Sequence, residues 1–137
     1  MPLDSVSLRP SVLIVEDEIL IADELSERLS NLGFLVIDAV DSAEEGIEIA
    51  VNERPSLVLM DIRLRGRKDG VEAAQEIREQ VDVPIVFLTA YSDRQTVERA
   101  KRTEHDGFIL KPFEKDELQS TIAVAMQRHA MRTDRKQ

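Results

Sequence analysis

Residues 57–61, Leu-Val-Leu-Met-Asp, place four consecutive apolar side chains directly before a carboxylate. An unbroken apolar run is typical of a strand that is covered on both faces, because a strand with one solvated face alternates apolar and polar residues. Similar runs occur at residues 12–15, 35–37, 85–88 and 108–110. We therefore predict five buried parallel strands. The run at 35–37 is flanked by Asp38 and Asp41, so we expect it at an edge of the sheet.

Segments with helical periodicity separate these runs. In the first segment, Ile21, Leu25 and Leu29 recur at a spacing that puts them on one face of a helix. Helices are predicted at residues 21–32, 43–51, 71–81, 92–102 and 118–129. The segment 92–102 is mostly polar, which indicates loose packing. Five alternations of strand and helix predict an α/β fold with helices on both faces of a parallel sheet.

The length and composition indicate one domain without a disulfide framework. The chain has 137 residues, which suits a domain over residues 11–129 with tails at 1–10 and 130–137. Its 27 acidic and 18 basic residues give a net charge of −9, which disfavours direct binding to nucleic acid or to an anionic membrane. The sequence contains no cysteine, no signal-peptide pattern at its start, and no apolar run near the roughly 20 residues that span a bilayer. A cytoplasmic location is the default expectation.

Polar residues follow four of the predicted strands. They are Glu16 and Asp17, Asp61, Thr89, and Lys111 with Pro112. In an open parallel sheet, ligands bind outside the carboxyl ends of the strands, at the point where the strand order reverses. We therefore expect these side chains to converge on one edge of the sheet.

The chemistry of this edge favours a metal and a phosphoryl group. Three carboxylates that lie together stay ionised only if a cation joins them. Oxygen ligands without histidine or cysteine select a hard ion such as Mg²⁺. Lys111 adds a positive charge and Thr89 a hydroxyl donor, so the set forms a cradle for a phosphoryl group. A carboxylate in such a site can act as the nucleophile and form an aspartyl phosphate.

Four short motifs, in this order along the chain, carry a resemblance to a known family. They are VLIVEDE at 12–18, LVLMDIRL at 57–64, VFLTAYSD at 86–93 and GFILKPF at 107–113. Over about residues 11–129, the chain resembles the receiver domain of two-component response regulators, the CheY-like superfamily. The resemblance implies a flavodoxin-like (βα)5 fold with strand order 2-1-3-4-5. It also implies a phosphorelay switch that accepts a phosphoryl group from a sensor histidine kinase or a phosphotransfer protein. Such a protein is not an enzyme beyond its own phosphorylation and dephosphorylation.

The resemblance assigns the acidic residues to the phosphoacceptor and the metal. Asp61 is expected to become phosphorylated. Asp17 is expected to hold Mg²⁺ directly and Glu16 to hold it through water, with Mn²⁺ as the alternative ion. Asp61 and the backbone carbonyl of Arg63 would complete the metal ligands.

The resemblance also assigns the residues that sense the phosphoryl group. The Thr89 hydroxyl would bond to this group and move toward it, while Ala90 leaves room for the shift and offers its backbone N–H. Lys111 would pair with the phosphoryl oxygens, and the Lys111–Pro112 bond is usually cis in the family. Phe108 resembles the aromatic switch residue that turns inward on activation.

Two departures from the usual pattern stand out. The acidic pair is Glu-Asp where many members have Asp-Asp, a common variant that should still bind Mg²⁺. The loop at 63–70 is longer and more basic than usual. In the family, the positions of Arg63 and Tyr91 influence how fast the phosphoryl group is hydrolysed, and a bulky Tyr91 is expected to slow the attack of water.

Taken singly, several of these residues also suit ordinary structural roles. Asp17 suits a helix N-terminus, Thr89 a turn, and Phe108 a core position. His129 suits the end of the last helix, and His105 is expected to be a solvated loop residue.

Functions of three further classes compete with the switch. A phosphorylation-independent pseudo-receiver, which acts as a protein-interaction module, is the main alternative, although its hallmark would be the loss of Asp61, of the acidic pair or of Lys111. A haloacid-dehalogenase-like phosphohydrolase would need an acid two residues after its nucleophile, where this chain has Arg63. A flavin phosphate would be repelled by the acidic run at residues 16–18.

The output surface is expected on the predicted helix 92–102, the strand 108–110 and the helix 118–129. Arg94, Arg99 and Lys101 lie beside Glu98 in the first of these helices, so this face offers charges of both signs. We expect it to form a homodimer that phosphorylation strengthens.

Overall fold

A computed structural model describes residues 9–90, 94–102 and 105–136 of the chain. Its strands form one parallel sheet in the order β2-β1-β3-β4-β5, which confirms the predicted order. The strands are β1 (Ser11–Val15), β2 (Leu35–Val40), β3 (Leu57–Asp61), β4 (Ile85–Ala90) and β5 (Gly107–Lys111).

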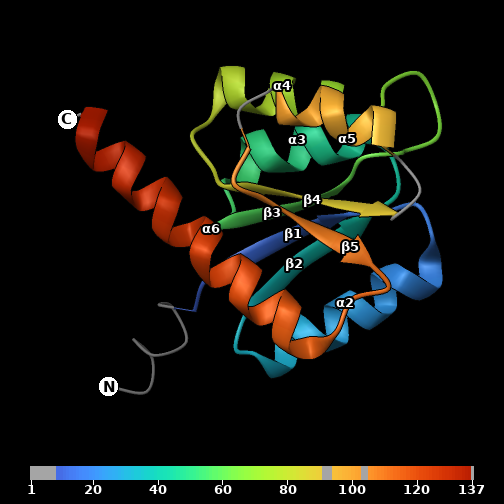
Figure 1. The fold of residues 1–137 in the computed structure, drawn as a ribbon, viewed down its shortest axis with the longest axis horizontal. Helices are drawn as coiled ribbons and strands as arrows, with labels where there is room; N and C mark the ends of the chain where they lie inside the picture. The colour runs from blue at the N-terminus through green and yellow to red at the C-terminus, as the bar shows by residue number, and fades with distance from the viewer. Residues whose placement is uncertain (1–8, 91–93, 103–104, 137) are drawn as a thin grey trace.

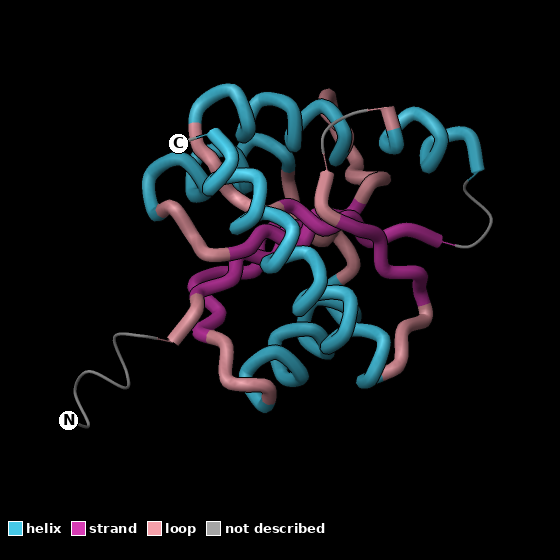
Figure 2. Tube along the Cα trace, turned by 60° about the vertical axis from the view of Figure 1, so that its left-hand side comes forward, coloured by secondary structure: helices cyan, strands magenta, loops and turns pink. Residues whose placement is uncertain are grey.

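Helices cover both faces of the sheet (Figures 1 and 2). They are α2 (Ile19–Asn31), α3 (Ala43–Glu53), α4 (Gly70–Gln80), α5 (Arg94–Lys101) and α6 (Lys115–Lys136). Figure 1 shows α3, α4 and α5 on one side of the sheet and α2 on the other, where α6 also packs. Within the described ranges, no helix is both long and apolar enough to cross a membrane.

Successive side chains of the central strands enter two separate cores. In β3, Leu57 and Leu59 pack with side chains of α2 and α6, whereas Val58 and Met60 pack with those of α3 and α4. This division follows from the two-residue period of a strand, which sends alternate side chains to opposite faces. Because both faces are covered by helices, every residue of β3 is buried. The prediction of doubly covered strands is confirmed.

Helix α4 begins directly against the end of β3. Asp69 caps its N-terminus by accepting a hydrogen bond from the backbone N–H of Glu72, and the Glu72 side chain accepts one from the N–H of Asp69. A Cβ atom on Gly70 would lie 2.0 Å from the backbone oxygen of Asp61, so a glycine is needed for this approach. The close junction holds the loop after Asp61 beside the carboxyl end of the sheet.

The structure corrects two predicted boundaries. The edge strand β2 continues to Val40, because Asp38 is exposed at an edge where solvent is available. The predicted C-terminal tail at 130–137 is helical as far as Lys136. The cause lies in contacts across the fold: His129 Nε2 is 2.9 Å from the Asp82 carboxylate, and Arg132 pairs with Asp106 at 2.6 Å.

Only the last part of the predicted N-terminal tail is described. Arg9 donates hydrogen bonds to the backbone oxygens of Gly33 and Phe34, and the Pro10 oxygen accepts one from the N–H of Leu35. These contacts tie the residues before β1 to the turn that precedes β2.

Candidate functional site

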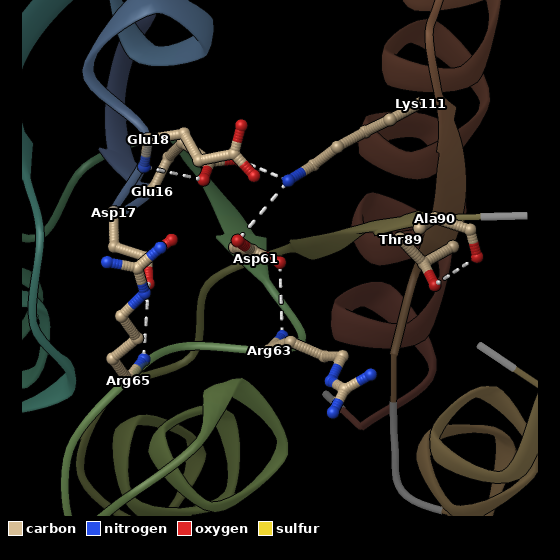
Figure 3. Close-up of polar contacts among 9 residues, drawn as sticks. All are labelled: Glu16, Asp17, Glu18, Asp61, Arg63, Arg65, Thr89, Ala90 and Lys111. Atoms are coloured by element: carbon tan, nitrogen blue, oxygen red, sulfur yellow. Dashed lines mark hydrogen bonds and ion pairs between the residues drawn. The ribbon is translucent and has the colours of Figure 1, made fainter. Parts of the chain in front are cut away.

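The carboxyl ends of β1, β3 and β5 bring three charged side chains together (Figure 3). Glu16 follows β1 directly and is anchored by a backbone hydrogen bond to the Val40 oxygen. Asp61 ends β3 and Lys111 ends β5. The central position of β3, between β1 and β4, places Asp61 within reach of residues from both halves of the sheet.

Lys111 lies between two buried carboxylates. Its Nζ atom is 2.7 Å from Glu16 Oε1 and 3.3 Å from Asp61 Oδ2. Only 2% of Glu16 and 5% of Asp61 is exposed to solvent, so the ammonium group balances charge in a site with little access to water.

The two partners shift each other's protonation. Burial raises the pKa of Glu16 to about 7; the hydrogen bond from Lys111 opposes this rise, and the nearby Asp61 adds to it. Burial by itself lowers the pKa of Lys111, but its hydrogen bond to Glu16 and the charge of Asp61 outweigh burial and raise it. Lys111 therefore remains a cation throughout the physiological pH range.

Three carboxylates form a cluster that fits a hard cation. Oxygen atoms of Glu16, Asp17 and Asp61 lie within 4.8 Å of one another. Ligand oxygens around an octahedral Mg²⁺, which sit at about 2.1 Å from the ion, are roughly 3 to 4 Å apart, so small side-chain movements suffice to close the set. The all-oxygen donor set suits that ion.

The loop after Asp61 contacts the acidic cluster through its backbone. The N–H of Arg63 donates to Asp61 Oδ1 at 3.0 Å, and the N–H of Arg65 donates to Asp17 Oδ2 at 3.2 Å. The Arg65 side chain also approaches Asp17, with its Nε atom 3.5 Å from Oδ2. The contact between Arg65 and Asp17 was not predicted; the basic run at 63–68 was the signal that could have indicated it. The loop thus orients both carboxylates from the same side.

Thr89 is placed close to the site but points elsewhere. It is buried near the end of β4, and its hydroxyl donates to the backbone oxygen of Ala90 at 3.3 Å. Figure 3 shows this hydroxyl directed away from Asp61. The structure therefore brings Glu16, Asp61 and Lys111 into contact and leaves Thr89 apart from them. The predicted rate-modulating residue Tyr91 lies outside the described residues.

Phe108 packs in an aromatic cluster with Phe87 and His105. Its ring centroid is 5.8 Å from that of Phe87 in β4 and 4.5 Å from that of His105. The expectation that His105 is a solvated loop residue is wrong, because its ring is half-buried against these two phenylalanines. The Lys111–Pro112 peptide bond is cis, as the resemblance implied.

Comparison with known proteins decides the family. Residues 12–123 match the family model of the response regulator receiver domain. The chain belongs to this family. The strand order and the acidic cluster at the carboxyl ends of β1 and β3 agree with that assignment.

Several curated regulators are similar to this receiver domain. It is 39% identical over 117 residues to the transcriptional regulatory protein PdtaR of Mycobacterium tuberculosis, with 85% of this chain and 57% of that protein covered. It is 32% identical over 123 residues to the phyllosphere-induced regulator PhyR of Methylorubrum extorquens, with 89% and 45% covered. The chain thus spans about half the length of these relatives.

Solved structures show the same fold. The signal receiver domain of a modulated diguanylate cyclase from Desulfovibrio desulfuricans superposes with a TM-score of 0.84 at 38% identity, over 90% of this chain and 98% of that one. The N-terminal domain of a response regulator/sensory box/GGDEF 3-domain protein from Carboxydothermus hydrogenoformans gives 0.81 at 29% identity, over 90% and 98%. The predicted receiver fold is confirmed.

Proposed function

We propose that this receiver domain accepts a phosphoryl group on Asp61 in a Mg²⁺-dependent reaction and changes conformation to control a partner. The donor would be the phosphohistidine of a sensor kinase or of a phosphotransfer protein. The observation that carries the proposal is the position of Lys111, whose ammonium group lies between Asp61 and Glu16. A pseudo-receiver is not favoured, because the phosphoacceptor, the acidic pair and this lysine are all present and lie together.

The transfer is a displacement at phosphorus. A carboxylate oxygen of Asp61 forms a bond to phosphorus while the bond between phosphorus and the donor imidazole nitrogen breaks. The electron pair of that bond stays on the nitrogen, which takes up a proton from solvent. Lys111 offsets the added negative charge, and the Arg63 N–H orients the Asp61 carboxylate for attack.

A metal ion completes the charge balance. Asp17 and Asp61 would hold Mg²⁺ together with the backbone carbonyl of Arg63, and Glu16 would contribute through water; Mn²⁺ is the alternative. Bound there, the ion supplies positive charge that offsets the carboxylates and the phosphoryl oxygens. Beyond its own phosphorylation and dephosphorylation, the domain would catalyse no reaction.

The change of conformation would begin at Thr89. Its hydroxyl now donates to the Ala90 oxygen, and a phosphoryl group on Asp61 offers a stronger, charged acceptor. Rotation of Thr89 toward that group, with the Ala90 N–H as a further donor, would open space behind it into which Phe108 turns. The side chains of Arg63 and Tyr91 would set how fast water removes the phosphoryl group.

The output surface would comprise α5, β5 and α6. A cavity of about 360 Å³ on this face is lined by Ala90, Arg94, Val97, Glu98, Lys101 and Leu110. Its mixture of charged and apolar side chains suits contact with a second copy, and we propose that phosphorylation strengthens a homodimer here. Equal sedimentation of the unmodified protein and a phosphoryl-mimic complex at high concentration would contradict this.

The cytoplasm is the location in which such a switch would meet its kinase.

Intact-mass spectrometry after incubation with acetyl phosphate tests the phosphoacceptor directly. We expect one phosphoryl adduct that requires Mg²⁺ and disappears in Asp61→Asn, an isosteric variant that removes only the charge of the nucleophile. Asp38→Asn, a change on the exposed edge strand, serves as the matched control and should keep the adduct. An adduct that persists in Asp61→Asn would move the phosphoacceptor to another residue, and no adduct in the unaltered chain would favour the pseudo-receiver.

A further inference from the structure

Three aromatic rings form a triangular cluster: Phe87 of β4, Phe108 of β5 and His105 directly before β5. The Phe87 and Phe108 centroids are 5.8 Å apart. The His105 and Phe108 centroids are 4.5 Å apart with the ring planes at 59°, and the His105 and Phe87 centroids are 6.3 Å apart at 54°. Tilted aromatic pairs in this distance range attract each other beyond the burial of their surface. His105 therefore contacts the residue that the proposed function assigns to switching.

The two neighbours of Phe108 differ in how firmly they are held. Phe87 is fully buried in the core beneath α4 and α5, so it can hardly move. His105 is half-buried in the connection between α5 and β5. Phe108 therefore contacts one ring that is fixed in the core and one ring in a connecting segment. Of these contacts, the one with His105 is the more easily broken.

His105 is placed as an uncharged ring. Within the described ranges, its Nδ1 atom is buried and has no hydrogen-bond partner. Burial lowers the pKa of His105; Asp106 acts in the opposite direction, and Arg78, Arg128 and Arg132 lower the pKa further. These four charged residues lie in α4, in α6 and directly before β5. The Asp106 charge is already engaged by Arg78 and Arg132, so it offers little compensation to a protonated imidazole.

We propose that His105 is a positioning residue for Phe108: its neutral imidazole ring packs against the phenylalanine and holds it beside Phe87, and Phe108 is released when His105 leaves this cluster. A charged His105 would be drawn toward solvent, since a protonated Nδ1 needs an acceptor and the positive charges of three arginines oppose that of the ring. The attraction between a cation and the phenylalanine faces opposes this exit but is small at a site that water can reach. The proposal rests on the proposed switch role of Phe108, while the contact itself can be tested without phosphorylation.

Nuclear magnetic resonance of the unphosphorylated, metal-free protein provides the first test. The ring resonances of Phe108 are followed from about pH 8 to about pH 5, around the ordinary histidine pKa near 6.5. The chain has two histidines, so His129→Gln leaves His105 as the one histidine in the protein, and His105→Phe reports any effect of Glu16, whose pKa of about 7 lies in the same range. We expect the Phe108 resonances to shift with the protonation of His105 in the unaltered chain and in His129→Gln, and to stay constant in His105→Phe. A Phe108 signal that ignores the titration of His105, or that shifts equally in His105→Phe, would overturn the proposal.

A second test separates bracing from general stability. His105→Phe keeps an aromatic ring beside Phe108, whereas His105→Gln removes it. We expect His105→Gln to accelerate phosphorylation by acetyl phosphate about two- to tenfold, the range in which one aromatic contact shifts a two-state equilibrium, and His105→Phe to restore a slow rate. Equal rates in the two variants would contradict the bracing role. If no variant and not even the unaltered chain is phosphorylated, the proposed function fails, and the resonance experiment still decides whether His105 positions Phe108.

Discussion

The Lys111 side chain places a positive charge between two carboxylates of the candidate site. Its ammonium group serves two carboxylates at once, Glu16 at 2.7 Å and Asp61 at 3.3 Å. Burial raises the pKa of Glu16 to about 7, so this carboxylate is close to taking up a proton even with the lysine present. Removing the lysine would leave Asp61 beside an acid that protonates readily, with no neighbouring charge to receive a phosphoryl group.

We expect Lys111→Met to impair both phosphorylation and stability. The initial rate with acetyl phosphate should fall by about 100-fold or more, the usual effect of removing one group that stabilises developing negative charge. The free energy of unfolding without divalent cations should fall by about 1–3 kcal/mol; the loss is smaller than for a rigid buried pair because Glu16 can protonate. Urea denaturation and timed mass spectra measure the two effects. The exposed Lys115→Met is the control, and a Lys111 variant that behaves like it would disprove the role.

At the scale of secondary-structure elements, the sequence predicted the strands and helices that have a periodic pattern. It did not predict the features that depend on contacts between residues far apart in the chain. Doubly covered strands and amphipathic helices leave periodic marks, so β1, β3 and β4 could be inferred, whereas the order of the strands was implied by the family resemblance. The meeting of Glu16, Asp61 and Lys111 followed from the rule that parallel strands share their carboxyl ends. The same rule gives the position of a residue but not its rotamer. The direction of the Thr89 hydroxyl, which donates a hydrogen bond to the Ala90 backbone oxygen, could therefore not be predicted.

The end of α6 and the environment of His105 were also not predicted, for the same reason. The last helix continues to Lys136 because side chains on it reach Asp82 and Asp106, residues that are far away in the sequence. His105 could not be recognised as an aromatic neighbour, since nothing in the sequence pattern indicates that a ring three residues before Phe108 contacts it. Neither contact leaves a periodic pattern in the sequence.

The junction of β3 and α4 gives a prediction at this scale. Gly70→Ala would place a Cβ 2.0 Å from the Asp61 backbone oxygen, so either α4 or the end of β3 must shift. We expect a loss of about 1–3 kcal/mol in the free energy of unfolding and a slower phosphorylation of Asp61. Gly46→Ala in α3 is the matched control: there the nearest atoms belong to the Val15 side chain, at 2.8 Å or more, and the gain in helix propensity offsets part of the strain. Equal losses in the two variants would show that the junction tolerates a side chain.

For the whole molecule, a charged network joins the elements at the end of the sheet opposite to Asp61. Asp106, of which 1% is exposed, accepts a hydrogen bond from the backbone N–H of Ile85 at 2.8 Å and pairs with Arg78 of α4 and Arg132 of α6. One carboxylate thus connects β4, the start of β5 and helices on both faces of the sheet. The site that would receive the phosphoryl group and the network that holds the layers together lie at opposite ends of the strands.

This separation predicts that stability and phosphorylation respond differently to the loss of Asp106. In Asp106→Ala, Arg78 and the Ile85 N–H lose a buried acceptor, so the free energy of unfolding should fall by about 3–5 kcal/mol. Amide exchange in the last turns of α6 should accelerate, because Arg132 loses its ion pair with Asp106. Asp82→Ala removes an exposed partner of His129 and should cost less than about 1 kcal/mol. Under conditions where the Asp106 variant remains folded, its rate of phosphorylation should stay within a few-fold of the unaltered chain, since Glu16, Asp61 and Lys111 keep their contacts. A collapse of that rate in a folded variant would mean that the two ends of the sheet are coupled.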